Sequence, residues 1–170
     1  MVKKSNWCFL LTLVLGMILT GCSSKPPSVE SVEEHFQNNY DDIQIVVEFM
    51  SNSGYNSIYI KGIDGMMLAD LEDVPITDES VFDAVKRLLG TPLTGNRQYY
   101  YVSKSSNTIE FYQWKGTAEI GCGIAYTING TDIPDVQYAT ELVQLSEPGW
   151  YYYVDDYNAW RTGKRPQLAN

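Results

Sequence analysis

Aromatic side chains gather in the second half of the chain, and they are its most evident means of binding a ligand. The clusters are Tyr99–Tyr101, Phe111 and Tyr112 with Trp114, Trp150–Tyr153, and Tyr157 with Trp160. Consecutive strand residues face opposite sides, so a run of tyrosines exposes at least one ring, which can stack on a sugar or enter a protein interface. The candidate binding residues are Tyr100, Trp114, Tyr152 and Trp160. The alternative is that the rings fill the core, because aromatic residues also favour strands.

Acidic residues form two local groups, Asp70 with Glu72 and Asp73, and Asp155 with Asp156. A glycosidase needs two carboxyl groups that flank the scissile bond. The chain contains 21 acidic residues, and sequence alone selects no such pair among them. A solvated acidic face is the simpler interpretation of both groups.

Other catalytic sets lack the residues they require. Cys122 stands in an apolar "GCG" stretch, which predicts a small buried core residue, and His35, the one histidine, is expected at the surface of a different element. A Cys–His nucleophile and a zinc site are therefore not expected. The chain has no Gly-rich phosphate loop, nucleophile elbow or calcium loop. We predict no catalytic residues, no metal ligands and no cofactor.

The start of the chain has the pattern of an export signal. Lys3 and Lys4 precede an apolar run that ends at Leu19, and the small residues Thr20 and Gly21 come directly before Cys22. A charged start, a short apolar run and a small-residue cleavage site are typical of a secretory signal peptide. A membrane-spanning helix would need about 20 apolar residues. We therefore predict a signal peptide over residues 1–21.

The stretch Leu19-Thr20-Gly21-Cys22 resembles the lipobox of bacterial lipoproteins. The resemblance implies that the Cys22 thiol receives a diacylglyceryl group, that a peptidase cuts between Gly21 and Cys22, and that the new amino terminus is acylated. The alternative is an ordinary signal peptide that happens to end in cysteine. Each buried methylene contributes about 0.8 kcal/mol, so two or three acyl chains would anchor the protein stably. The chain end, "GWYYYVDDYNAWR", is similar to the ends of small uncharacterised bacterial lipoproteins, which implies no activity.

Composition limits the partners of the mature chain. Loss of residues 1–21 would remove two of the 12 basic residues and none of the 21 acidic ones, which leaves 149 residues with a net charge near −11. Such a charge disfavours nucleic acid and anionic lipid surfaces, so contact with the membrane would come through the lipid on Cys22. Cys122 would have no cysteine partner for an intrachain disulfide. The Ser- and Pro-containing residues 22–30 predict an extended, flexible tether.

Periodic apolar residues predict two helices. The spacing of Val32, Phe36, Tyr40, Ile43 and Met50 indicates one helix over about residues 30–52, with a cap at Ser28 or a capping box from Ser31 to Glu34. The alternative is a strand over "IQIVVEF". The second helix lies in "ITDESVFDAVKRLLG", capped by Thr77 or Asp78 and ended by Gly90.

Alternating residues predict the strands. They lie in residues 55–62 and 63–71, joined by Asp64-Gly65, then in 97–104 and 108–116 as a hairpin, and in 118–128, 139–146 and 150–154. One helical turn follows in "DDYNAWR". The prediction is a single α+β domain over residues 31–161, with two helices packed on one face of an antiparallel sheet, and a polar tail over 162–170.

These features together predict a lipid-anchored protein of the cell envelope that faces outside the cytoplasm. The acidic surface and aromatic strands favour a non-catalytic binding or accessory domain for another envelope or extracellular protein. One alternative is a surface lipoprotein that binds or cleaves carbohydrate. Another is an inhibitory or immunity-type lipoprotein with a single tight protein partner.

Overall fold

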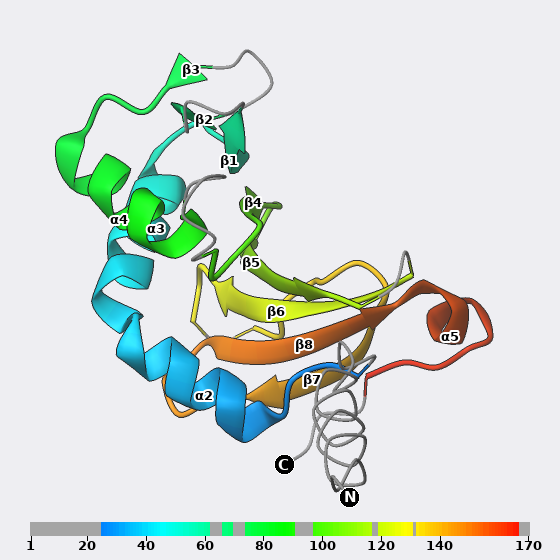
Figure 1. Ribbon diagram of the computed structural model, residues 1–170. Helices are drawn as coiled ribbons and strands as arrows, with labels where there is room; N and C mark the ends of the chain where they lie inside the picture. The colour runs from blue at the N-terminus through cyan, green and yellow to red at the C-terminus, as the bar shows by residue number, and fades with distance from the viewer. Residues whose placement is uncertain are drawn as a thin grey trace, which may run out of the picture.

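The computed structural model describes residues 25–61, 66–69, 74–90, 97–116, 119–130 and 132–166. Its helices are α2 (Val29–Asn38), α3 (Tyr40–Asn52), α4 (Glu79–Leu89) and α5 (Tyr157–Arg161). Its strands are β1 (Ser57–Lys61), β2 (Met66–Ala69), β3 (Val74–Pro75), β4 (Tyr101–Lys104), β5 (Thr108–Lys115), β6 (Ile120–Thr127), β7 (Ala139–Gln144) and β8 (Trp150–Asp156). The predicted α+β class with an antiparallel sheet is confirmed (Figure 1).

The sheet has eight strands within the described residues, in the order β3-β2-β1-β4-β5-β6-β8-β7, and all neighbours pair antiparallel. Neighbouring strands are mostly consecutive in the chain. The exceptions are β1, which lies beside β4, and β6, which lies beside β8. Because β7 lies beyond β8, the connection from β6 to β7 must cross β8. We call the described residues of this connection, 128–130 and 132–138, the crossover loop.

The main core lies between the sheet and α2, α3 and α4, which follow one side of the sheet in Figure 1. Phe36 on α2, Phe111 on β5 and Trp150 on β8 are buried at its centre. Their rings meet at centroid distances of 4.9 Å for Phe36–Trp150 and 6.0 Å for Phe111–Trp150. Burial of such large apolar side chains is the dominant stabilising term in folding. A smaller cluster lies on the opposite face of the sheet, formed by Ala125, Val136, Ala139, Leu142 and Tyr153.

The predicted single helix over 30–52 is wrong in its continuity, because α2 and α3 are separated at Asn39. The backbone of Asn39 leaves the helical region (φ −122°, ψ 11°), and its side-chain Nδ2 donates a hydrogen bond to the carbonyl of His35 at 2.8 Å. Asparagine competes for backbone groups in this way and so favours helix ends. The alternative strand over the same residues is also wrong.

The start of α2 agrees with the predicted cap at Ser28. Ser28 caps α2 by accepting a hydrogen bond from the backbone N–H of Ser31, so the helix begins at Val29, within the stretch expected to be tether. The hydroxyl of Tyr152 donates to the carbonyl of Pro27 at 2.9 Å. The chain is therefore held against the sheet from Pro27 onward.

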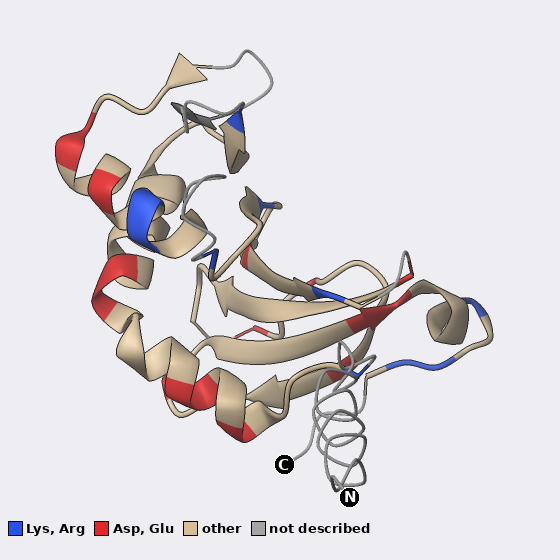
Figure 2. Cartoon of the chain, viewed as in Figure 1, with Lys and Arg blue, Asp and Glu red and all other residues tan. Residues whose placement is uncertain are grey.

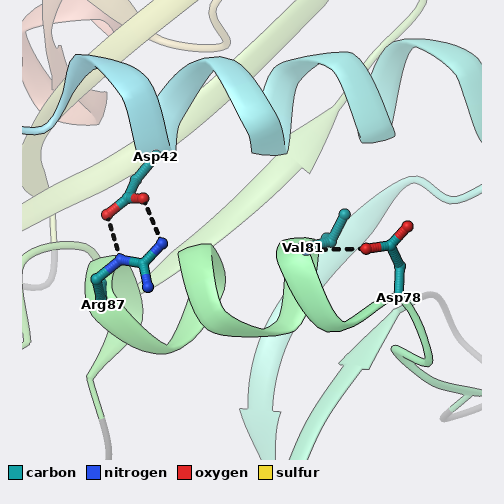
Figure 3. A network of polar contacts seen from close by, with 4 residues as sticks. All are labelled: Asp42, Asp78, Val81 and Arg87. Atoms are coloured by element: carbon teal, nitrogen blue, oxygen red, sulfur yellow. Dashed lines mark hydrogen bonds and ion pairs between the residues drawn. The ribbon is translucent and has the colours of Figure 1, made fainter.

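Helix α4 is confirmed with both of its predicted ends. Asp78 accepts hydrogen bonds from the backbone of Ser80 and Val81, and Gly90 ends the helix with a φ of 65°, a conformation that favours glycine. Arg87 near the end of α4 forms a two-pronged pair with Asp42 on α3, with both N–O distances at 2.7 Å (Figure 3). This pair joins the two helices at the surface, above the apolar side chains that they share in the main core.

The remaining predictions of elements hold where the structure describes them. The hairpins β1–β2 and β4–β5, the strands β6, β7 and β8, and the helical turn α5 are all present. The Asp64-Gly65 turn, the acidic group Asp70, Glu72 and Asp73, and Gly21 with Cys22 lie outside the described residues. Within the described part of the chain, no helix has the length and apolar character that a bilayer crossing requires.

Candidate functional site

One face of β6 is almost without side chains. Gly121, Gly123 and Ala125 alternate with Cys122 and Ile124, which are buried in the main core. The small residues therefore share the opposite face, away from α2, α3 and α4. A Cβ atom added at Gly123 would collide with the backbone carbonyl of Phe111, and one added at Gly121 would collide with the hydroxyl of Tyr112. The glycines are required because neighbouring atoms already occupy that space.

Side chains from the adjacent strands converge over this bare face. The strand register aligns Tyr101 on β4, Tyr112 on β5, Gly123 on β6 and Tyr153 on β8 in one row across the sheet. The three tyrosines of this row line a pocket of about 310 Å³. The residues that line it are Tyr101, Ser103, Glu110, Tyr112, Val136, Gln137, Tyr138, Tyr153 and Asp155. We call it the tyrosine–carboxyl pocket.

The crossover loop closes one side of the pocket. Its residues Val136, Gln137 and Tyr138 line the pocket. The loop is tied to the sheet by two hydrogen bonds. The backbone N–H of Asp135 donates to Thr108 Oγ1 at 3.0 Å, and the backbone N–H of Asp156 donates to the carbonyl of Tyr138 at 3.2 Å. Tyr138 has a φ of 63°, which is uncommon for a residue other than glycine. Non-glycine residues held in this region cluster at functional sites.

Two carboxyl groups in the pocket are harder to ionise than usual. Burial, followed by repulsion from Asp155 and Asp135, raises the pKa of Glu110 to about 7. Burial also raises the pKa of Asp155, although backbone N–H groups of Asp155 and Gly121 oppose the rise. Figure 2 shows acidic residues at the end of β8, and Asp155, which lines the pocket, is one of them. Glu110 can therefore exchange a proton near neutral pH.

Two buried oxygen atoms at the pocket have no hydrogen-bond partner, Tyr153 Oη and Asp155 Oδ1. The side chain of Tyr153 is 1% exposed. Its hydroxyl approaches Glu110 and slightly opposes the rise in the Glu110 pKa, but the pair does not meet hydrogen-bond geometry. Because nearly all buried polar groups in proteins are paired, these two atoms indicate a place where a ligand could supply the missing partners.

Aromatic rings border the pocket on two sides. On one side, Tyr101 stacks on Tyr112 with a centroid distance of 5.0 Å, and Tyr100 contacts Tyr112 at 6.3 Å. On the other side, Tyr138 contacts Tyr157 at 5.0 Å and Trp160 at 5.2 Å. Tyr100, Tyr101 and Tyr157 are among the large hydrophobic side chains that remain exposed. We call these two groups the aromatic rims.

The structure divides the four predicted binding residues. Tyr100 and Trp160 belong to the aromatic rims, one on each side of the pocket. Tyr152 is only 2% exposed and faces the main core, so it is not accessible to a ligand. A register shift between Tyr112 and Trp114 places Trp114 opposite Cys122, and Trp114 packs against the main core instead of lining the pocket.

Sequence reasoning missed Glu110, Tyr153 and the pocket face of β6. Asp155 was interpreted as part of a solvated acidic face, which is wrong, since it is half-buried in the pocket. Its neighbour Asp156 instead caps α5 by accepting from the backbone N–H of Ala159. A signal was present in the alternation of Gly121, Gly123 and Ala125, because glycine inside a strand often marks a close approach of other atoms.

The predictions for Cys122 and His35 have opposite outcomes. Cys122 is fully buried and free, as predicted, and burial raises the pKa of its thiol to about 12. The surface position predicted for His35 is wrong, because its ring packs at 5.5 Å from Tyr99 and burial lowers its pKa. The described residues contain no group of three side chains that could hold a metal ion.

A larger hollow of about 480 Å³ lies between α3 and the start of α4. Its polar lining is already in use, since Asp78 caps α4 and Asn52 donates to the carbonyl of Glu48 at 3.0 Å. The hollow therefore presents less unmet hydrogen-bonding capacity than the tyrosine–carboxyl pocket. We take the latter as the candidate functional site.

Comparisons with known proteins identify no relative: no protein-family model matches the chain, no curated protein matches it, and no solved structure matches its fold.

Replacement of Gly123 by alanine should destabilise the fold. The new methyl group would meet the backbone of β5, which cannot move without breaking strand pairing, so we expect a loss of about 1–3 kcal/mol in unfolding free energy. Gly121→Ala should cost less, because the ends of the Tyr112 and Asp155 side chains can turn aside. Gly54→Ala, where no atom lies within 4 Å of the added Cβ, is the control. Urea unfolding measures all three, and equal stability of the Gly123 and Gly54 variants would refute the close approach.

The free energy of unfolding should fall as pH rises, because Glu110 must ionise inside the folded domain. Its pKa is about 7 in the folded state against 4.5 ordinarily, so the folded state holds the proton more tightly. The loss of unfolding free energy caused by Glu110 is absent below about pH 4.5 and grows as pH rises toward 7. Glu110→Gln should reduce this fall in unfolding free energy by up to about 3 kcal/mol. Urea unfolding across this pH window tests it, with the exposed Glu34→Gln as control. Identical pH slopes in the wild-type protein and the Glu110 variant would contradict the assignment.

Proposed function

We propose that the chain is a lipid-anchored envelope protein, attached through Cys22 and facing outside the cytoplasm, whose domain binds a protein partner at the tyrosine–carboxyl pocket. The observation that carries the binding role is the pair of buried, unpartnered oxygens, Tyr153 Oη and Asp155 Oδ1. A partner that supplies hydrogen-bond donors there would remove a cost that the free domain retains. The aromatic rims supply the flat apolar surface that protein interfaces favour.

The position of Pro27 supports a role close to the membrane. Its carbonyl accepts a hydrogen bond from the Tyr152 hydroxyl, so the chain is held against the sheet from this residue onward. Five residues from Cys22 to Pro27 span at most about 18 Å when fully extended. A lipid on Cys22 would therefore hold the domain near the bilayer, where a membrane-associated partner is the nearest available ligand.

Carbohydrate is the second candidate ligand. A pocket lined by tyrosines with two carboxyl groups, Glu110 and Asp155, is the feature that this alternative requires. Glu110, with a pKa of about 7, has the property expected of a general acid. We favour a protein partner because the aromatic rims extend the contact surface well beyond a pocket of about 310 Å³. An inhibitory lipoprotein would use the same surface, and the identity of the captured partner distinguishes it.

The lipid anchor predicts that Cys22→Ala abolishes fatty-acid attachment. Cells grown with labelled palmitate should incorporate label into the wild-type protein and not into this variant, which should also remain uncleaved at Gly21. Cys122→Ala is the matched control, because Cys122 is buried in the core and should not be acylated. Undiminished label in the Cys22 variant would show that the lipid anchor is wrong.

Photo-cross-linking in the producing cells tests the binding surface. A benzophenone amino acid at Gln137, an exposed residue that lines the pocket, should yield a discrete cross-linked protein species. The same amino acid at Glu34, exposed on α2, should not yield it. Cross-linking to glycan instead of protein would favour the carbohydrate alternative. No product at Gln137, or the same product at both positions, would argue against the pocket as the binding surface.

A further inference from the structure

We propose that the tyrosine–carboxyl pocket recognises an alkylammonium group, either the side chain of a lysine on the partner or a small free amine. This inference rests on the proposed function and specifies the chemistry of the same pocket. An alkylammonium group combines a positive charge, hydrogen-bond donors and an apolar stem. Each property has a counterpart in the residues that line the pocket.

The charge of the pocket is negative. Glu110 on β5 and Asp155 on β8 contribute carboxyl groups from two different strands, and no Lys or Arg is found among the described residues that line it. Asp135 adds repulsion at Glu110, and Asp156 adds it at Asp155. A cation in the pocket would favour the ionised form of both carboxyl groups, so its binding would relieve this repulsion.

The unpartnered atoms are suited to a ligand that donates. Tyr153 Oη and Asp155 Oδ1 can both accept hydrogen bonds. A primary ammonium carries three donors and no acceptor, so it could satisfy both oxygens at once. A sugar hydroxyl carries no positive charge, so it would leave the charge of the two carboxyl groups uncompensated.

The aromatic surroundings favour a cation of this size. Tyr101, Tyr112, Tyr138 and Tyr153 line the pocket, and the face of an aromatic ring attracts cations. The chain itself uses the aromatic rims in this way: the Arg97 guanidinium lies 5.1 Å from the centroid of Tyr100, and that of Arg165 lies 4.2 Å from Trp160. A bare metal ion would instead need a set of oxygen, nitrogen or sulfur ligands, and the described residues contain no group of three such side chains.

Binding should be coupled to the release of a proton. Asp155 and Tyr153 face Glu110 from β8, Asp135 faces it from the crossover loop, and Tyr101 from β4. With none of these groups positively charged, a bound ammonium would stabilise the Glu110 carboxylate and lower its pKa from about 7. The affinity for an ammonium should therefore rise with pH until Glu110 is ionised, and fall up to about tenfold per pH unit below that point.

The test uses the full chain in detergent micelles, isothermal titration calorimetry and pairs of probes of which one carries a primary ammonium group and the other does not. The first pair is n-butylammonium and the neutral 1-butanol. The second is a blocked lysine amide and the corresponding norleucine amide. We expect the ammonium probe of each pair to bind and its neutral counterpart to bind at least about tenfold more weakly. Preference for n-butylammonium would indicate a small amine as the natural ligand, and preference for the lysine amide a partner protein.

Variants locate the binding in the pocket. Asp155→Asn should weaken binding of the charged probe by about tenfold, and Glu34→Gln on the opposite side of the sheet should leave it unchanged. The probe pairs and the pH dependence are measured on the wild-type protein, so they test the inference even if the Asp155 variant does not fold. Equal affinity for charged and neutral probes, no binding of either, or affinity that rises at low pH would overturn the inference. If cross-linking at Gln137 nevertheless persists, the proposed partner surface stands and only the ammonium chemistry fails; if it is lost as well, both fail.

Discussion

Strand β6 carries the constraint on which both faces of this domain depend. It pairs with β5 on one side and β8 on the other, so its backbone is fixed by hydrogen bonds along both edges. Cys122 and Ile124 fill the main core under the helices, while Gly121 and Gly123 leave room on the opposite face for the side chains of Tyr112 and Tyr153. The same strand thus completes the core and lets side chains that line the pocket lie close to its backbone.

The pocket is built at a cost in stability. Two carboxyl groups are held where burial raises their pKa, two buried oxygens lack hydrogen bonds, and Tyr138 occupies an uncommon backbone conformation. Each of these features is unfavourable in the free domain. They lie together beside the crossover loop, on the side of the sheet away from the helices. Such concentration of unfavourable features is typical of a binding site that a rigid scaffold supports.

The opposite side of the sheet provides that scaffold. Helices α2, α3 and α4 pack there around Phe36, Phe111 and Trp150, and the Asp42–Arg87 pair joins α3 to α4. The break at Asn39 lets α2 and α3 each present an apolar side to the sheet, with Phe36 buried on one helix and Ile43 on the other. The bond from Tyr152 to Pro27 extends this rigid side to the point where the predicted tether begins. A partner at the pocket would then meet a domain held at a defined distance from its anchor.

The sequence by itself determined the elements and their class. Apolar residues that recur every second position located the strands, and those that recur every third or fourth position located the helices. Capping and stop residues such as Asp78 and Gly90 located helix ends. All these signals depend only on neighbouring residues. The lipobox-like stretch that ends at Cys22 is also local, and so it supports an expectation about location without any fold. The break at Asn39 was missed because its capping bond competes with an otherwise continuous helical pattern.

Only the tertiary structure decided which side chains form the site. Tyr153 lines the pocket and Tyr152 does not, because of the direction in which each face of β8 points. Trp114 is kept out of the pocket by the register shift in β5. Glu110 and Asp155 are 45 positions apart in the chain, and they line the same pocket because β6 lies between their strands and carries only small residues on that face. Burial then raises the pKa of both carboxyl groups. Long-range strand order and burial set these properties, and no local pattern in the sequence encodes either.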